Sequence, residues 1–269
     1  MGALRILFLG DVVGASGLEA LAARLPGLVA RTGAHLVIAN GENVAGGVGI
    51  TGEGARRMRE AGVDVITTGN HVWARRELLG SIDKLPFLLR PANLPPSAPG
   101  RGWCVVEAGG ASVAVVNLIG RVFMGPAECP FRTADRVLEE IGAAASVVFV
   151  DFHAEATSEK RALGWHLDGR VAAVVGTHTH VATADAQVLS KGTGYLTDAG
   201  MCGVPESVIG VGHREVLTRF LSGVPERLSV ARGGVALCGA LLEVDPADGR
   251  CIRIERLEVG PGDRGRGGP

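Results

Sequence analysis

Apolar residues in the first two thirds of the chain gather in short runs that are rich in β-branched side chains. Because neighbouring as well as alternate positions are apolar, these runs are typical of strands that are buried on both faces. Helical patterns separate them. The predicted strands are LRILFLG (4–10), HLVIAN (35–40), DVITTG (64–69), SVVFVD (146–151) and VAAVVG (171–176).

The segments between the strands have the apolar spacing of helices, and several of them open with Ser or Thr, residues that often cap a helix N-terminus. Strands that alternate with helices predict an α/β fold with a mostly parallel sheet. The predicted helices cover residues 16–32, 51–62, 133–142 and 157–167.

After residue 186 the pattern changes to strands with turns between them, and we expect these to form a second sheet packed on the first. The apolar run 226–244 could complete that sheet or pair across subunits, so a homo-oligomer stays open. The Pro- and Gly-rich segment 90–102 is expected to be a surface loop and a candidate rim or lid. Residues 1–259 are expected to form a single domain, followed by a disordered tail over 260–269.

The amino-acid composition indicates which class of partner the protein binds. Of the 269 residues, 46% are hydrophobic, and 27 basic side chains nearly balance 28 acidic ones. These values argue against intrinsic disorder and against a protein that binds nucleic acid without regard to sequence. A small-molecule partner is the better expectation.

Five widely spaced cysteines, without a C-x-x-C pair, argue against a disulfide framework and against a structural zinc site. The apolar N-terminal run is too short for a signal sequence or a membrane span, and it ends at an acidic residue. We therefore expect a cytoplasmic protein with reduced thiols and no membrane partner.

Polar side chains that could bind a metal follow each of the five predicted strands. In a mostly parallel sheet the carboxyl ends of the strands meet at one edge, where ligand sites form. Two carboxylates, two amides and four imidazoles at one edge are the mixture of oxygen and nitrogen ligands that a divalent metal prefers. They are Asp11, Glu42, Asn43, Asn70, His71, His153, His178 and His180.

Each of these residues also has an ordinary structural explanation. Asp11 could cap the helix that follows it, Glu42, Asn43 and Asn70 could be turn residues, and His153 could be a hydrogen-bonded core histidine. The His-x-His pair, His178 and His180, does not decide between the two explanations by itself. The metal hypothesis rests on the set rather than on any single member.

The first strand-to-helix turn, GDVVGASG, resembles a dinucleotide-binding turn in its glycines. Its spacing is not G-x-G-x-x-G, however, and Asp11 would repel a pyrophosphate. A dinucleotide cofactor is therefore not expected.

The order Asp11, Glu42, GNH (69–71), His153 and GTHTH (176–180) resembles the pattern of the calcineurin-like metallophosphoesterase superfamily. Within it, blocks between residue 10 and about residue 201 resemble the YmdB-like phosphodiesterase branch. They include GDVVG, ANGENVAGG, RPANLPP, VDFHAEATSEK and TDAGM.

The resemblance implies a four-layer α/β/β/α sandwich with two metal ions between the ends of its two sheets. One ion would bind Asp11, Glu42, Asn43 and His180; the other would bind Glu42, Asn70, His153 and His178, with Glu42 bridging. The chain departs from the wider superfamily at Val13, where a histidine is usual, and at Glu42, where an aspartate is usual. The resulting oxygen-rich first site favours iron or manganese, with zinc or magnesium as alternatives.

The implied reaction is hydrolysis of a small phosphodiester, such as 2′,3′-cyclic or 3′,5′-cyclic AMP, by a hydroxide that bridges the two metals. His71 is the candidate general acid for the leaving oxygen. Asp151, Thr177 or Thr179 could orient the histidines, or could be satisfied polar residues at strand ends. Two alternatives remain: a metallo-amidohydrolase, whose His-x-His pair follows the first strand of a barrel, and a regulatory protein that binds a nucleotide or a partner with little turnover.

Overall fold

The computed structural model describes residues 2–263 and contains two β-sheets. The first sheet has the order β2-β11-β12-β1-β3-β4, and β13 pairs with β12. Parallel pairs join β1 to β3 and β3 to β4, whereas β12 runs antiparallel to β1. Its strands are β1 (Leu4–Leu9), β2 (Asp11–Val12), β3 (Leu36–Asn40), β4 (Val65–Thr67), β11 (Met201–Gly203), β12 (Ala236–Val244) and β13 (Cys251–Val259).

The second sheet has the order β5-β6-β7-β8-β10-β9. The inner strands β6, β7, β8 and β10 are parallel, and β5 and β9 run antiparallel to their neighbours. Its strands are β5 (Trp103–Ala108), β6 (Ala111–Ile119), β7 (Val147–His153), β8 (Ala173–Thr177), β9 (Gln187–Val188) and β10 (Gly194–Leu196).

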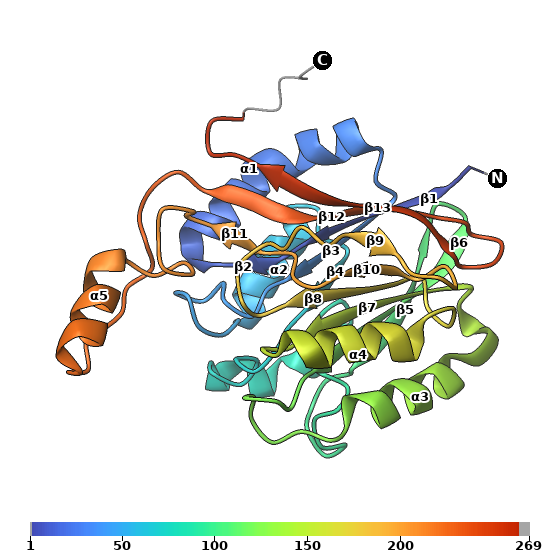
Figure 1. Cartoon of the computed structure of the whole chain (residues 1–269), viewed down its shortest axis with the longest axis horizontal. Coiled ribbons are helices and arrows are strands. Elements are labelled where there is room, and N and C mark those ends of the chain that lie inside the picture. The colour runs from blue at the N-terminus through green and yellow to red at the C-terminus, as the bar shows by residue number, and fades with distance from the viewer. Residues whose placement is uncertain (1, 264–269) are drawn as a thin grey trace.

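Helices cover the outer faces of both sheets. Helices α1 and α2 lie against the first sheet, and α3 and α4 lie against the second (Figure 1). The helices are α1 (Gly14–Thr32), α2 (Gly52–Glu60), α3 (Pro130–Ile141), α4 (Thr157–Leu167) and α5 (His213–Ser222), and short 3-10 turns cover Arg76–Gly80, Ile82–Lys84 and Gly142–Ala144.

Three hydrophobic cores separate these layers, and strand β1 shows why its sequence is apolar throughout. Leu7 and Leu9 pack toward the first helical layer, whereas Ile6 and Phe8 face the second sheet. Between the sheets the ring centroids of Phe8 and Phe149 are 5.1 Å apart. Both faces of the strand are therefore buried. The predicted four-layer α/β/β/α sandwich is confirmed.

The expected division of strands between the sheets was wrong. The C-terminal strands do not form a sheet of their own, because β12 and β13 join β1 in the first sheet and β9 and β10 join β8 in the second. Strands β7 and β8, expected in the same sheet as β1, belong to the second sheet. A strand that is apolar on both faces carries no signal for which neighbour it pairs with.

Two local expectations were also incomplete. The hairpin of β5 and β6 was not predicted at all. In the run 226–244 only β12 is a strand, and it pairs with β1 and β13 of the same chain. The expected Ser or Thr cap was correct at Thr51, whose Oγ1 accepts a hydrogen bond of 2.9 Å from the Gly54 amide, and wrong for the helices predicted over 16–32, 133–142 and 157–167, which begin without a side-chain cap.

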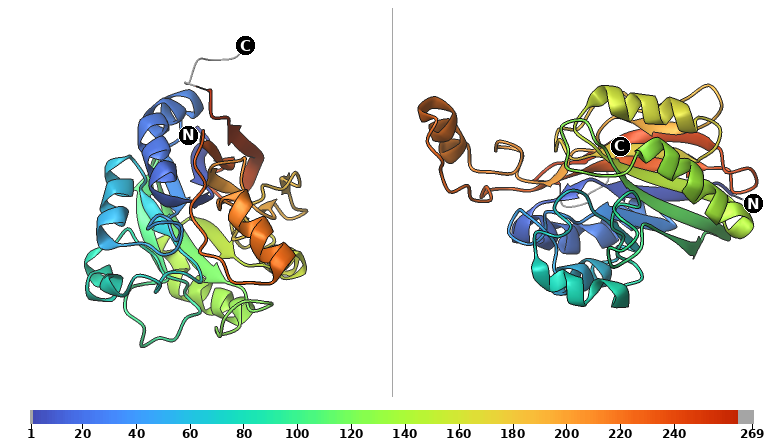
Figure 2. Two further views of the ribbon diagram at one scale, coloured as in Figure 1. Left: turned by 90° about the vertical axis from the view of Figure 1, so that its left-hand side faces the viewer. Right: turned by 90° about the horizontal axis from the view of Figure 1, so that it is seen from below.

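Helix α5 projects away from the sandwich (Figure 2), and Val216 is its one buried residue. The single domain over residues 1–259 stays a prediction. In the expected tail, residues 264–269 lie outside the described residues. Among those that are described, no helix has the length and apolarity needed to cross a membrane.

Candidate metal centre

The carboxyl ends of β1, β3 and β4 in the first sheet and of β7 and β8 in the second meet at one edge of the sandwich. The edge is shared because the sheets face each other with these strands aligned. Strands β2 and β11 mark it in Figure 1, at the end from which α5 projects. All eight residues singled out in the sequence belong to this edge, from Asp11 at the start of β2 to His180 after β8.

A compact cluster surrounds the Nε2 atom of His153. This atom lies 3.0 Å from Glu42 Oε1, 2.9 Å from Asn70 Oδ1 and 3.0 Å from His178 Nδ1. Glu42, His153 and His178 each offer a ligand atom within a space that one metal ion could fill. The four residues are those assigned above to the second ion.

Polar groups on the far side of each imidazole favour a proton on the nitrogen that faces away from the cluster. Thr177 donates its single hydroxyl hydrogen to Asp151 Oδ1 at 2.7 Å, so it accepts the 2.9 Å bond from His153 Nδ1. The Glu155 carboxylate lies 3.1 Å from His178 Nε2 and favours a proton on that nitrogen. With the protons on these outer nitrogens, both nitrogens that face the cluster carry lone pairs.

With this tautomer at both histidines and Glu42 ionised, the cluster brings four electron-pair donors together. Such an arrangement is repulsive unless a cation lies among the donors. The residues thus fit a metal ion on the chemistry of the donor set.

The residues assigned to the first ion are more widely spaced. His180 Nε2 is 3.8 Å from Asp11 Oδ1. Within residues 2–263, three buried side-chain polar atoms lack a hydrogen-bond partner, and two of them are Asp11 Oδ1 and Asn43 Oδ1. Buried oxygens without partners are costly, and a cation would satisfy both.

Burial also sets the charge of the site. It raises the pKa of Asp11 and of Glu42 above the ordinary carboxyl value. Burial lowers the pKa of His153 and of His178 to about 4. The imidazoles are therefore neutral, which is the form that binds metals, and a bound cation would favour the ionised carboxylates.

His71 lies at the cluster without joining it. Its backbone amide donates a 2.9 Å hydrogen bond to Glu42 Oε2, and its Nε2 lies 3.2 Å from the Asn70 amide nitrogen. The side chain is only partly buried. It therefore lies beside the proposed ligands and is partly accessible to solvent.

An unusual backbone presents the two histidines of GTHTH. His178 and His180 adopt left-handed conformations, with φ of 103° and 65°. Between them, Thr179 donates its amide (3.1 Å) and its hydroxyl (2.8 Å) to Asp198 Oδ2. Asp198 forms a fully buried ion pair with Lys160, whose Nζ lies 2.7 Å away. This pair holds the loop in its strained form.

Two glycines of the motifs are required by close contacts. A Cβ on Gly69 would lie 2.1 Å from the His153 ring, and a Cβ on Gly176 would lie 1.8 Å from the Thr197 carbonyl oxygen. Any other residue at either position would displace the site.

Sequence reasoning missed Glu155, Lys160 and Asp198. Glu155 follows His153 by two residues, and the other two are polar residues within the VDFHAEATSEK and TDAGM blocks. Asp151, proposed to orient an imidazole, contacts His153 through Thr177, and Thr179 bonds to Asp198 rather than to a histidine.

Other polar residues near the predicted strands do not join the site. The Arg90 guanidinium donates to the carbonyls of Pro91, Ala98 and Pro99 and so closes the loop 90–102. Trp73 packs against the core of the first sheet.

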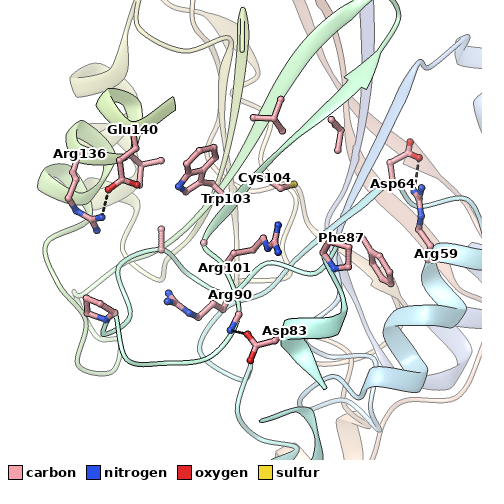
Figure 3. Close-up of a pocket in the computed structure, with 18 residues that line it drawn as sticks. Arg59, Asp64, Asp83, Phe87, Arg90, Arg101, Trp103, Cys104, Arg136 and Glu140 are labelled. Carbon is pink, nitrogen blue, oxygen red and sulfur yellow. Dashed lines mark hydrogen bonds and ion pairs between the residues drawn. The ribbon is translucent and has the colours of Figure 1, made fainter. Parts of the chain in front are cut away.

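A cavity of about 830 Å³ is lined by part of the loop 90–102 and by the edge strand β5 (Figure 3). None of the eight site residues lines it. Among its charged side chains, Arg59 pairs with Asp64 and Arg136 pairs with Glu140. The cavity is therefore separate from the metal cluster.

Comparison with known proteins places this geometry in a family. The model of the YmdB-like protein family matches residues 7–257. A 2′,3′-cyclic-nucleotide 2′-phosphodiesterase of Bacillus subtilis is 44% identical over 256 residues, which is 95% of this chain and 97% of the relative.

Solved structures agree with the sequence relationship. A phosphatase from Mycoplasma pneumoniae has a TM-score of 0.91 at 35% identity, with 97% of this chain and 94% of that chain covered. A 5′-nucleotidase from Staphylococcus aureus shares the fold alone, with a TM-score of 0.61 at 15% identity; the match covers 94% of this chain and 54% of that one.

The resemblance drawn from the motifs and the expectation of a phosphoester hydrolase are both confirmed. The family also implies metal ions, in agreement with the donor cluster around His153. The chain belongs to the YmdB-like branch of the metallophosphoesterases.

Proposed function

We propose that this enzyme hydrolyses small cyclic nucleotides at a dinuclear metal centre, with 2′,3′-cyclic nucleotides as its preferred substrates. The observation that carries the proposal is the set of four electron-pair donors that face one another around His153 Nε2. The preference for the 2′,3′-cyclic form over 3′,5′-cyclic AMP follows the name of the Bacillus subtilis relative.

Asp11, Asn43 and His180 would hold one ion, Asn70, His153 and His178 the other, and Glu42 would bridge. When bound, two such ions lower the pKa of a water molecule and neutralise the charges that develop on a phosphodiester. Three oxygen donors and one imidazole around the first ion favour manganese or iron.

Residues of the chain itself position the bridging carboxylate and the proton donor. The backbone amide of His71 holds Glu42 Oε2, so Glu42 Oε1 remains directed at His153. The His71 side chain, partly exposed beside Asn70, would donate a proton to the oxygen that leaves phosphorus. For a 2′,3′-cyclic nucleotide that oxygen is O2′ and the product is a 3′-phosphate.

A small phosphodiester is a better candidate substrate than a nucleic-acid duplex, because basic and acidic side chains nearly balance over the chain. All five cysteines are unpaired, which suits the cytoplasm as the place of action.

The test measures hydrolysis of 2′,3′-cyclic AMP, 3′,5′-cyclic AMP and bis-p-nitrophenyl phosphate by purified protein, with Mn²⁺, with Fe²⁺ and with chelator. We expect metal-dependent turnover that is fastest with the 2′,3′-cyclic substrate. Glu42→Gln should abolish it, whereas Glu139→Gln, on the exposed face of α3, should not change it. Absence of hydrolysis under every metal condition would instead support a regulatory nucleotide-binding protein.

A further inference from the structure

Left-handed backbone conformations at residues other than glycine are concentrated near the metal cluster. In residues 2–263 there are four: Phe123, His178, His180 and Ile209. His178 and His180 are proposed ligands, and the carbonyl of Ile209 lies 2.8 Å from His180 Nδ1. Such conformations are costly for residues with a Cβ and accumulate at functional sites. Phe123 is the member of this set with no role so far.

The segment that carries Phe123, residues 120–124, begins beside a proposed ligand. Ile119, the last residue of β6, pairs in register with His153 of β7. The next amide, that of Gly120, donates a 3.0 Å hydrogen bond to the carbonyl of His153. The segment 120–124 therefore leaves the second sheet at its catalytic edge.

A buried carboxylate fixes the direction of this segment. Glu159 of α4 is 8% exposed, and its carboxylate accepts hydrogen bonds of 3.0–3.1 Å from the amides of Arg121 and Val122. The two successive amides are thus held in place immediately before Phe123. The strained conformation at Phe123 is built into the fold, not a property of an unanchored loop.

No contact of the Phe123 side chain explains why the backbone is held in this costly conformation. The Phe123 ring is 89% exposed, although burying it would be favourable. Arg121, also exposed, lies two residues away. The other aromatic residue near the motifs, Trp73, is packed against the core. An exposed aromatic ring on an anchored backbone, with an exposed arginine two residues away in the chain, is suited to stacking on a nucleobase.

We propose that Phe123 stacks on the base of the substrate, and that the segment 120–124 thereby makes the enzyme prefer nucleotides to phosphodiesters without a base. This proposal rests on the proposed function and adds the part of the substrate that the metal cluster does not contact. Phe123 is a specificity residue and takes no part in the chemistry.

The test compares two cyclic phosphates, 2′,3′-cyclic AMP and the base-free cyclic phosphate of propane-1,2-diol. Phe123→Asn removes the ring but tolerates the left-handed backbone. We expect kcat/KM for 2′,3′-cyclic AMP to fall about 5- to 150-fold, mainly through KM, the loss expected for one stacked base. The base-free substrate should be unaffected, and Phe123→Tyr should retain the wild-type preference.

Trp165→Ala removes another exposed aromatic ring, on α4. It serves as the control and should leave kcat/KM unchanged for both substrates. Equal losses on both substrates would overturn the proposal. So would an unchanged KM accompanied by an altered oligomeric state in size-exclusion chromatography, since the ring would then pack against another subunit.

Binding separates this proposal from the proposed function. Calorimetry on the metal-loaded protein measures the dissociation constants of 3′-AMP and of inorganic phosphate. Phe123→Asn should weaken the binding of 3′-AMP and leave the binding of inorganic phosphate unchanged. That result would support stacking even if the wild-type protein did not turn over, and equal affinities in wild type and variant would refute it.

Discussion

The state of individual side chains decides what the centre can bind. The outer nitrogen of His153 donates to Thr177 and that of His178 lies beside the Glu155 carboxylate, an arrangement that leaves the opposite nitrogen of each ring to face the cluster. Thr177, Asp151 and Glu155 therefore determine the chemistry of the centre although they offer it no ligand atom. Neutral imidazoles, fixed in one tautomer, are prepared for a cation before it arrives.

At this scale we predict that His71→Ala keeps the metals and loses turnover. The substitution preserves the backbone amide that holds Glu42, and it removes a side chain that contacts only Asn70 among the proposed ligands. A lost general acid typically lowers kcat about 10²- to 10⁴-fold. The loss should be smaller for bis-p-nitrophenyl phosphate, whose leaving group needs no proton.

Metal content by elemental analysis is measured beside kcat, and His166→Ala, on the outer helix α4, is the matched control. A His71→Ala protein that loses its metals would show that His71 is a ligand and has no role as an acid.

At the level of elements, the sequence predicted which segments would be strands but not how the strands would pair. Continuous apolar runs identify β1, β3, β7 and β8, yet a strand that is buried on both faces fits several neighbours equally well. The hairpin of β5 and β6 was missed. The sandwich could be predicted only through the resemblance of the motifs to a family.

The residues of the site, too, were only partly visible in the sequence. Its ligand candidates were visible because each follows an apolar run. Lys160 and Asp198 were not, since a lysine in a helix and an aspartate after a strand usually face solvent. Only the tertiary structure shows that both are fully buried behind GTHTH.

The loop that carries His178 and His180 should depend on this ion pair. Lys160→Met leaves the Asp198 charge buried and unpaired, which we expect to lower the free energy of unfolding by about 3–5 kcal/mol. The double variant Lys160→Met with Asp198→Asn should lose less than the sum of the two single variants.

Urea unfolding in the presence of chelator measures these changes without a contribution from bound metal. Arg136→Met, which breaks the exposed pair of Arg136 with Glu140, is the control and should cost at most about 1 kcal/mol. Additive effects of the two buried substitutions would contradict the role given to this pair.

At the scale of the whole molecule, the proposed metal ligands come from both sheets. Asp11, Glu42 and Asn70 follow strands of the first sheet, and His153 and His178 follow strands of the second. Metal ions bound between them would join the two layers at the catalytic edge.

Metal removal should therefore destabilise the folded protein as well as stop catalysis. A ligand that binds only the folded state at 100 times its dissociation constant adds about 2.7 kcal/mol. We expect Tm to rise with Mn²⁺ and to fall with chelator, and we expect Glu42→Gln to suppress most of the rise. An unchanged Tm at saturating Mn²⁺ would mean that no such centre forms.

The hydrogen bond between the His178 amide and the Asp11 carboxylate joins residues 167 positions apart in the chain. No continuous fragment shorter than that distance can contain both partners. On the ribosome, the GNH motif emerges long before the histidines that complete its site, so the nascent chain cannot retain a metal at this position early in synthesis. A metal ion held by residues from both sheets would therefore bind only after the two sheets have docked, at a late stage of folding.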